Sequence, residues 1–281
     1  MESIQRIKAR IHSIGITRQI TQSMRLVSSS KVQKARNRMV DNQPFLANAR
    51  QMASSVLHNR ELDRHPYVAA RPVKTSAVIV ISGDRGLCGS YNAAVGKSAT
   101  QLVKSLGDCR IITIGSKAKE YCQRRRGSAV AQSFIGMSEK PFFEDAQEIA
   151  SLALDWYKKG QVDQIYMVYT EYVSAIEQNP KAEKLLPLGS GEREPGSGFI
   201  EFEPDVESFV ERAVPFYVAG SLYGAMLEAS ACEQSARLTS MDSAVKNSDE
   251  MIASLTLLYN QARQAAITQE IIEIVSGAET L

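Results

Sequence analysis

The residues best placed to do chemistry are three glycines within the segment Gly83–Gly89. They follow an apolar run at Thr75–Ser82 and precede a helix-like stretch at Tyr91–Leu106. Backbone N–H groups in such a turn can cradle a phosphate. The spacing is G-x-x-G-x-x-G with no Lys-Ser/Thr pair after it, so the Walker pattern is absent, and Gly115 stands where an acidic residue would hold a ribose. Two interpretations stay open, a nucleotide site and a tight strand-to-helix turn.

Other reactive side chains are scattered along the chain. The histidines lie on or beside the N-terminal segment, away from Cys88, so a Cys/His nucleophile pair is unsupported. The cysteines form no C-x-x-C pair, and no cluster has metal-ligand spacing. We therefore expect no active site, metal or cofactor of its own, and free thiols in a reducing cytoplasm. The residues concerned are Cys88, Cys109, Cys122, Cys232, His12, His58 and His65.

Charge is distributed unevenly along the 281 residues, although the net charge is only +2. Residues 1–40 hold nine Lys/Arg against one acid, a net of +8, whereas residues 206–281 hold four basic against ten acidic residues, a net of −6. Two segments of opposite sign are expected to lie against each other, to face charged partners or to be solvated faces. The basic segment lacks interleaved aromatics, so nucleic acid is not a predicted partner. The longest apolar runs, such as Ala77–Ile81, are far below the ~18 residues of a membrane span.

Both ends of the chain are predicted to be very long helices, at residues 1–60 and 206–281. Proline is absent before Pro44 and after Pro215. At about 1.5 Å per residue such helices reach about 80–90 Å, longer than the ~50 Å diameter of a compact body of this length. They must therefore project from the body, as a shaft, a spacer or an arm does. The simplest arrangement is an antiparallel pair.

A heptad repeat supports this pairing, because both segments carry a largely apolar seam. In the N-terminal segment the stretch Arg18–Ser28 interrupts the seam with polar residues, and we expect it to face water or another protein. Only Ser248 interrupts the C-terminal seam. The N-terminal seam is Ile4, Ile7, Ile11, Ile14, Arg18, Thr21, Arg25, Ser28, Val32, Ala35, Met39, Leu46, Ala49, Ala53 and Val56; the C-terminal seam is Leu238, Met241, Val245, Ser248, Ile252, Leu255, Tyr259, Ala262 and Ala266.

The middle segment, residues 73–205, alternates strand and helix patterns, which is typical of a mostly parallel Rossmann-like sheet. The predicted fold class is therefore α/β, a long antiparallel coiled coil of N- and C-terminal helices plus a Rossmann-like α/β domain. A polar loop at Gly189–Gly198 is expected to be a mobile hairpin tip. The predicted strands are Thr75–Ser82, Arg110–Ile114, Ser128–Ser133 and Gln164–Tyr172, and the helices Tyr91–Leu106, Ser116–Arg126 and Phe142–Lys159.

Three stretches carry a specific resemblance. The residues Ile20–Met24 (ITQSM) with Ser28–Lys31 (SSSK), Asp84–Gly89 (DRGLCG) and Ala262–Ala278 (ARQAAITQEIIEIVSGA) closely resemble the gamma subunit of bacterial-like F-type ATP synthases, in the same order and over essentially the whole chain. The resemblance implies a central rotor shaft that couples ion-driven rotation of the membrane c-ring to ATP synthesis or hydrolysis in an α3β3 head. Such a subunit is non-catalytic. It acts by contacting the conformations of the β subunits differently.

The resemblance also implies partners and contact residues. The partners are the α and β subunits, the epsilon subunit and the c-ring, at the cytoplasmic face of the bacterial plasma membrane, with peripheral attachment and no direct span. Two rival functions stay open, a nucleotide-binding Rossmann-like protein and a coiled-coil scaffold without a rotary role. The residues expected to contact the α3β3 hexamer are Met24, Arg237, Arg263, Gln264, Thr268 and Glu270.

Overall fold

The computed structural model describes residues 4–58, 60–124, 129–175, 177–190 and 205–279. The described chain forms two compact units. One, here called the coil unit, comprises the described residues of Met1–Ser28 and Leu238–Leu281; the other, the α/β unit, is Ser29–Arg237. Both long helices contribute to both units. The predicted division into segments 1–60, 73–205 and 206–281 follows the chain rather than these units and stays a prediction.

The α/β unit is built on a five-stranded sheet of order β3-β2-β1-β4-β5. β1 pairs in parallel with β2 and β4, β2 in parallel with β3, and β5 runs antiparallel to β4. This confirms the mostly parallel sheet. The strands are β1 Thr75–Ile81, β2 Asp108–Ile114, β3 Ala129–Phe134, β4 Gln164–Tyr172 and β5 Gln178–Leu186; the helices are α1 Ile4–His58, α2 Tyr91–Leu106, α3 Ser116–Gln123, α4 Phe143–Lys158 and α5 Val206–Glu279, with short 3-10 turns at Arg60–Arg64 and Leu188–Ser190. The predicted loop at Gly189–Gly198 falls mostly on residues 191–204, outside the described residues.

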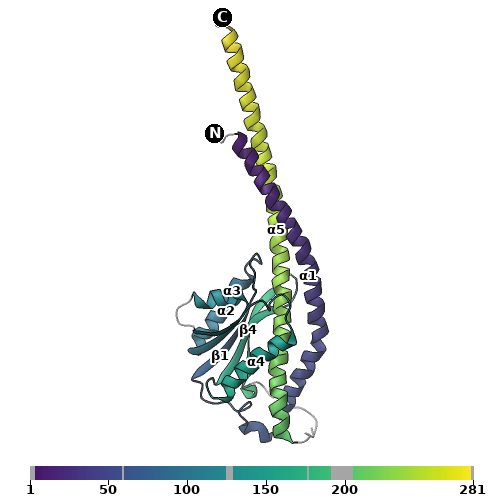
Figure 1. Cartoon of the computed structure of the whole chain (residues 1–281), viewed down its shortest axis with the longest axis vertical. Helices are drawn as coiled ribbons and strands as arrows, with labels where there is room; N and C mark the ends of the chain where they lie inside the picture. The colour runs from purple at the N-terminus through teal and green to yellow at the C-terminus, as the bar shows by residue number, and fades with distance from the viewer. Residues whose placement is uncertain (1–3, 59, 125–128, 176, 191–204, 280–281) are drawn as a thin grey trace. The chain divides into compact units, whose positions relative to one another are not determined.

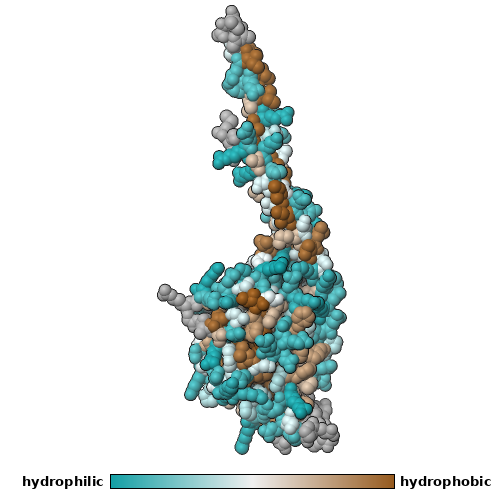
Figure 2. All heavy atoms as spheres, viewed as in Figure 1, coloured by the Kyte–Doolittle hydropathy of each residue, from teal (hydrophilic) through white to brown (hydrophobic). Residues whose placement is uncertain are grey.

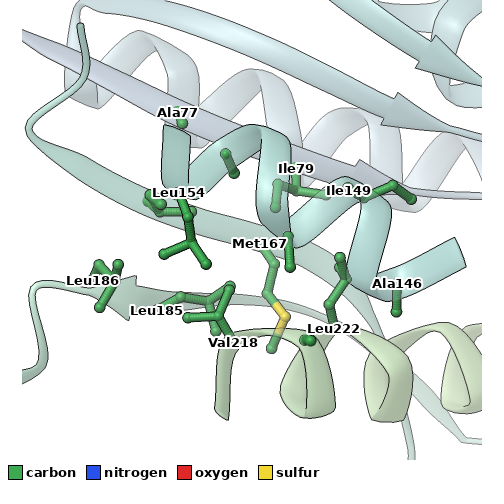
Figure 3. Packing of buried hydrophobic residues seen from close by; sticks show 14 of the residues in the cluster. Ala77, Ile79, Ala146, Ile149, Leu154, Met167, Leu185, Leu186, Val218 and Leu222 are labelled. Atoms are coloured by element: carbon green, nitrogen blue, oxygen red, sulfur yellow. The ribbon is translucent and has the colours of Figure 1, made fainter. Parts of the chain in front are cut away.

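Helices cover both faces of the sheet, so its central strands are apolar on both sides. On one face, Ile79 of β1 and Met167 of β4 pack against Ile149 of α4 and Leu222 of α5 (Figures 1 and 3). On the other face, alternate residues of β1, beginning with Val78, pack against α2 and α3. Successive strand residues point to opposite faces, which explains why the run Thr75–Ser82 lacks a polar alternation.

Within the α/β unit, α1 and α5 approach closely because α5 carries two glycines on the facing side. A Cβ added at Gly224 would lie 2.9 Å from a methyl carbon of Leu46, and one at Gly220 would lie 3.2 Å from the ring of Phe45. Both helices continue through a proline, Pro44 in α1 and Pro215 in α5. The two long helices predicted from the sequence are thus confirmed. No helix in the described ranges is long and apolar enough to cross a membrane.

In the coil unit, α1 and α5 run antiparallel, as two ion pairs show. Arg18 bonds to Asp249, and Arg25 bonds to Asp242 at 3.1 Å, so residue numbers rise along one helix as they fall along the other. The heptad register is confirmed, since every predicted seam position of both helices is buried or half-buried.

One expectation about the seam was wrong. The seam residues of the polar stretch Arg18–Ser28 are at least partly buried. Ser28 is buried, and Arg18, Thr21 and Arg25 are half-buried. The two arginines reach acidic residues of α5 instead. The helices are held there by charge pairs and a small side chain in place of aliphatic packing.

Candidate functional site

The glycine-rich loop Gly83–Gly89 follows β1 and is closed by one side chain of α2, Asn92. Asn92 Oδ1 accepts hydrogen bonds from the hydroxyl of Ser82 at 2.7 Å and from the backbone N–H of Gly83 at 3.1 Å. Its Nδ2 donates to the carbonyl of Arg85 at 3.2 Å and to the Cys88 Sγ at 3.0 Å. The loop is thus a tight strand-to-helix turn, one of the two interpretations left open.

The carboxylate of Asp84, in the same loop, binds three backbone N–H groups from other segments at the end of the sheet. It accepts hydrogen bonds from the backbone N–H groups of Ser116 at 2.9 Å, Gly136 at 3.0 Å and Ser138 at 3.2 Å. These donors follow the carboxyl ends of β2 and β3, where doubly wound folds bind ligands. Burial pushes the pKa of Asp84 up, but the hydrogen bonds outweigh it and hold the pKa below the ordinary aspartate value. The chain therefore supplies its own anion to this site.

We expect Asp84→Ala to lower the free energy of unfolding by about 1.5 kcal/mol at neutral pH, near the lower end for hydrogen bonds to a charge because Asp84 is half-exposed. Since the pKa of Asp84 is lower in the folded state, its stabilisation is full above the unfolded pKa and is lost as the pH falls through the folded one. The difference in the free energy of unfolding between wild type and Asp84→Ala should become smaller in acid. Urea titrations followed by the fluorescence of Trp156, the single tryptophan, measure it. Glu148→Ala, at an exposed position of α4, is the control, and a gap that widens in acid would contradict the assignment.

A buried ion pair ties the same loop to α5. Glu233 is 2% exposed and Arg237 is 7% exposed, and Arg237 Nη2 donates to Glu233 Oε1 at 2.6 Å. The guanidinium also donates to the carbonyl of Gly86 at 3.2 Å. A Cβ at Gly83 would lie 2.8 Å from the Glu233 carboxyl carbon, so a larger residue there would displace the Glu233 carboxylate. Burial raises the pKa of Glu233 above the ordinary glutamate value, and Arg237 offsets this only in part.

The residues expected to contact a partner fall into three settings. Arg237 has its guanidinium engaged inside the α/β unit, as described above, and Met24 is half-buried in the coil unit. The other four are exposed and are brought together on α5 within the coil unit, where the hydroxyl of Thr268 donates to the carbonyl of Gln264 at 2.9 Å. Those four are Arg263, Gln264, Thr268 and Glu270. Their contact with a partner stays a prediction.

An exposed apolar face on the same stretch of α5 was not among the predicted contact residues. Ile267, Ile271, Ile274 and Val275 are 43%, 55%, 71% and 52% exposed, and apolar side chains line this end of the helix in Figure 2. The first three are spaced four and three residues apart, so they share one face. The sequence already contained this pattern, because apolar residues at helical spacing continue beyond Ala266, the last position of the seam. Exposed apolar faces of this kind mark binding surfaces.

Titratable groups offer little else for chemistry. In the ranges that the structure describes, no group of three or more His, Cys, Asp or Glu side chains is arranged to hold a metal ion. All four cysteines are free and buried. Burial raises the pKa of the Cys109 and Cys122 thiols to about 11, so neither is a reactive thiolate at neutral pH.

Comparison with known proteins covers the whole chain. A family profile described as ATP synthase matches residues 3–281. An ATP synthase gamma chain of Alkaliphilus metalliredigens is 42% identical over 99% of this chain and 98% of its own length. A relative named "ATP synthase gamma chain, sodium ion specific", from Acetobacterium woodii, is 36% identical over 100% of this chain and 99% of its own.

Solved structures share the fold. A chain of the Euglena gracilis mitochondrial ATP synthase (OSCP/F1/c-ring) superposes with a TM-score of 0.67 at 15% identity, covering 99% of this chain and 94% of its own. A chain of the Tetrahymena thermophila mitochondrial ATP synthase central stalk/c-ring gives 0.66 at 23% identity, covering 80% of this chain and 99% of its own.

Proposed function

Since this chain belongs to the ATP synthase gamma chain family, we infer that it is the central rotor shaft of an F-type ATP synthase. It couples ion-driven rotation of the membrane c-ring to ATP synthesis or hydrolysis in an α3β3 head. The observation that carries this function is the antiparallel pair of long helices, α1 and α5, joined to an α/β unit in a chain that matches gamma chains from end to end.

The proposed subunit is non-catalytic, and ATP chemistry belongs to its partners. The glycine-rich loop supports this, because Asn92 closes it as a strand-to-helix turn through bonds to Ser82 and to the backbone N–H of Gly83. The same observation weighs against the rival nucleotide-binding function. A scaffold without a rotary role is disfavoured by the full-length match to gamma chains.

The proposed partners are the α and β subunits, the epsilon subunit and the c-ring. The similar solved structures are of assemblies that contain F1 and the c-ring, and the epsilon subunit is implied by the sequence resemblance. We place the subunit at the cytoplasmic face of a bacterial plasma membrane, held there peripherally through these partners. Bacterial relatives support this location.

The shaft acts through contacts that differ between partner conformations. The last turns of α5 expose both apolar side chains and the polar residues Arg263 and Gln264. A β conformation that covers this surface is stabilised relative to one that does not, and rotation changes which copy of β is favoured. Arginine suits such a contact because its planar guanidinium can bind a carboxylate with two hydrogen bonds.

The test of this function is the double variant Arg263→Ala/Gln264→Ala in a reconstituted complex. ATP hydrolysis and ion-driven synthesis are expected to fall about tenfold, which corresponds to about 1.4 kcal/mol of lost differential contact. Because both side chains are exposed, folding and assembly should be unchanged. Asn247→Ala, at another exposed position of α5, is the matched control. Unchanged ATP turnover in a fully assembled double variant would show that these two residues are ordinary solvated side chains.

A further inference from the structure

A pocket opens in the α/β unit between α1, the end of β4 and α5, away from the contact residues discussed above. Its volume is about 210 Å³, which leaves room for the end of a long side chain. Among the described residues that line it, two are carboxylates and none is a cation, so the lining is negatively charged. The lining includes Met39, Asn42, Gln43, Glu171, Val173 and Glu228.

Glu228 is the carboxylate of this pocket that lacks a counter-charge. Its Oε2 accepts a hydrogen bond from the backbone N–H of Tyr172 at 3.2 Å. Its Oε1 is accessible to solvent and has no hydrogen-bond or ion-pair partner among the residues that the structure describes. Burial, with a smaller contribution from the charge of Glu171, raises the pKa of Glu228 above the ordinary glutamate value. A cation that reached Oε1 would relieve this unfavourable environment.

The cations that act on Glu228 each pair with another carboxylate. They are Lys181 and Arg50, and both lower the pKa of Glu228 only in part. Lys181 Nζ lies 2.6 Å from Glu171 Oε1, and Arg50 Nη2 lies 3.9 Å from Glu183 Oε1. Three carboxylates thus share two cations. The charge that is missing has to come from another molecule.

We propose that this pocket receives an arginine side chain of a partner protein. The acceptors of the pocket come from three elements: Glu228 of α5, Glu171 of β4, and the side-chain amides of Asn42 and Gln43 on α1. A guanidinium carries five N–H donors in one plane and is weakly hydrated, so it matches several acceptors at once. A lysine ammonium has three donors and is more strongly hydrated, so it is the poorer fit.

The apolar part of the lining favours a side chain over a free ion. Val173 is 52% exposed, and with Met39 it provides a surface against which the methylene groups of an arginine can pack. Covering this surface removes apolar area from water, which a bare cation does not do. A metal ion is disfavoured as well, because in the ranges with described coordinates no three His, Cys, Asp or Glu side chains are grouped to hold one.

Isothermal titration of the full-length chain with N-butylguanidinium, a probe that mimics the arginine side chain, tests the pocket. We expect saturable millimolar binding, with N-butylammonium about fivefold weaker. Glu228→Gln should weaken N-butylguanidinium about tenfold. This variant keeps the size of the side chain and an acceptor for the N–H of Tyr172, so it should fold. Glu148→Gln, the same change at an exposed position of α4, is the control and should leave the affinity unchanged.

A second variant tests the apolar contact with the stem. Val173→Ser should weaken N-butylguanidinium while leaving the affinity for the plain guanidinium ion unchanged, because only the butyl group packs against Val173. Val173 is exposed, so the substitution should not affect folding.

The reconstituted complex shows where the guanidinium comes from, and this part of the test rests on the proposed function. Carbodiimide with glycine ethyl ester labels accessible carboxylates, so peptide mass spectrometry should find Glu228 labelled in the free chain and protected in the complex. One arginine of a partner subunit should be protected from phenylglyoxal in the wild-type complex and become reactive in the complex that carries Glu228→Gln.

Several results would overturn the proposal. In the free chain these are no saturable binding of N-butylguanidinium, equal affinity for N-butylammonium, or an affinity that Glu228→Gln leaves unchanged. In the assembled complex they are equal labelling of Glu228 with and without partners, or no partner arginine whose reactivity changes. A chain that does not assemble would instead contradict the rotor function, and the affinities of the free chain would then decide whether the pocket binds a guanidinium.

Discussion

Replacing Arg237 by leucine is expected to lower the free energy of unfolding of the α/β unit by about 3–5 kcal/mol at neutral pH, because it leaves a buried carboxylate without a counter-charge. Glu233 is 2% exposed and loses the guanidinium that donates to it at 2.6 Å, and the carbonyl of Gly86 loses the same donor. Urea unfolding followed by Trp156 fluorescence reports on this unit, since the single tryptophan lies in α4.

The double variant Glu233→Leu/Arg237→Leu distinguishes two free energies. One is the destabilisation caused by an unpaired buried charge, and the other is the contribution of the ion pair to stability. Replacing both members of a buried pair by apolar residues is often close to neutral, so we expect most of the stability to return. A pH series adds a second check. Since burial raises the folded-state pKa of Glu233, the loss in Arg237→Leu should be greatest at neutral pH and shrink as the carboxylate takes up a proton in acid. If Arg237→Leu lowered the free energy of unfolding by less than about 1 kcal/mol at neutral pH, as for an ordinary surface ion pair, the pair would be hydrated and not buried.

Leu255→Asp is the second substitution with a large expected effect, about 3–5 kcal/mol in the coil unit. Leu255 is 8% exposed on the seam of α5, so the change removes a buried aliphatic side chain and places a carboxylate there. Thermal melts followed by circular dichroism should show an earlier loss of helix. Leu257→Asp is the matched control, because the same change is made two residues away at a side chain that is 61% exposed. Coincident melts of wild type and Leu255→Asp would mean that this seam does not hold the helices together.

Much of the fold could be predicted from periodicity alone. The first and last residues of α2 and β4 were predicted correctly. The helical period of 3.6 in α2 and the apolar run in β4 each end at turn residues. Both heptad seams were also right over their described lengths. The polar seam at Arg18–Ser28 was misjudged for a physical reason. Arginine on a seam is unfavourable alone and favourable opposite an aspartate, and the partner is known only once the register of the two helices is known.

The site was harder to predict than the fold. Glu233 and Arg237 are four residues apart on a helix, a spacing typical of an exposed ion pair. Their burial depends on the loop at Gly83–Gly89, which lies far away in sequence and packs against them only in the folded chain. Asp84 was visible as part of a sequence motif, but its three backbone partners come from segments that meet only at the end of the sheet.

The uncovered apolar side chains at the end of α5 have a consequence for the life of the free chain in a cell. Surfaces such as Ile271 and Ile274 attract chaperones, proteases and other copies of the chain until a partner covers them. A subunit made in excess should therefore be degraded or aggregate, while one that meets its partners soon after synthesis survives. The amount of the protein would then follow the supply of its partners rather than the strength of its own expression.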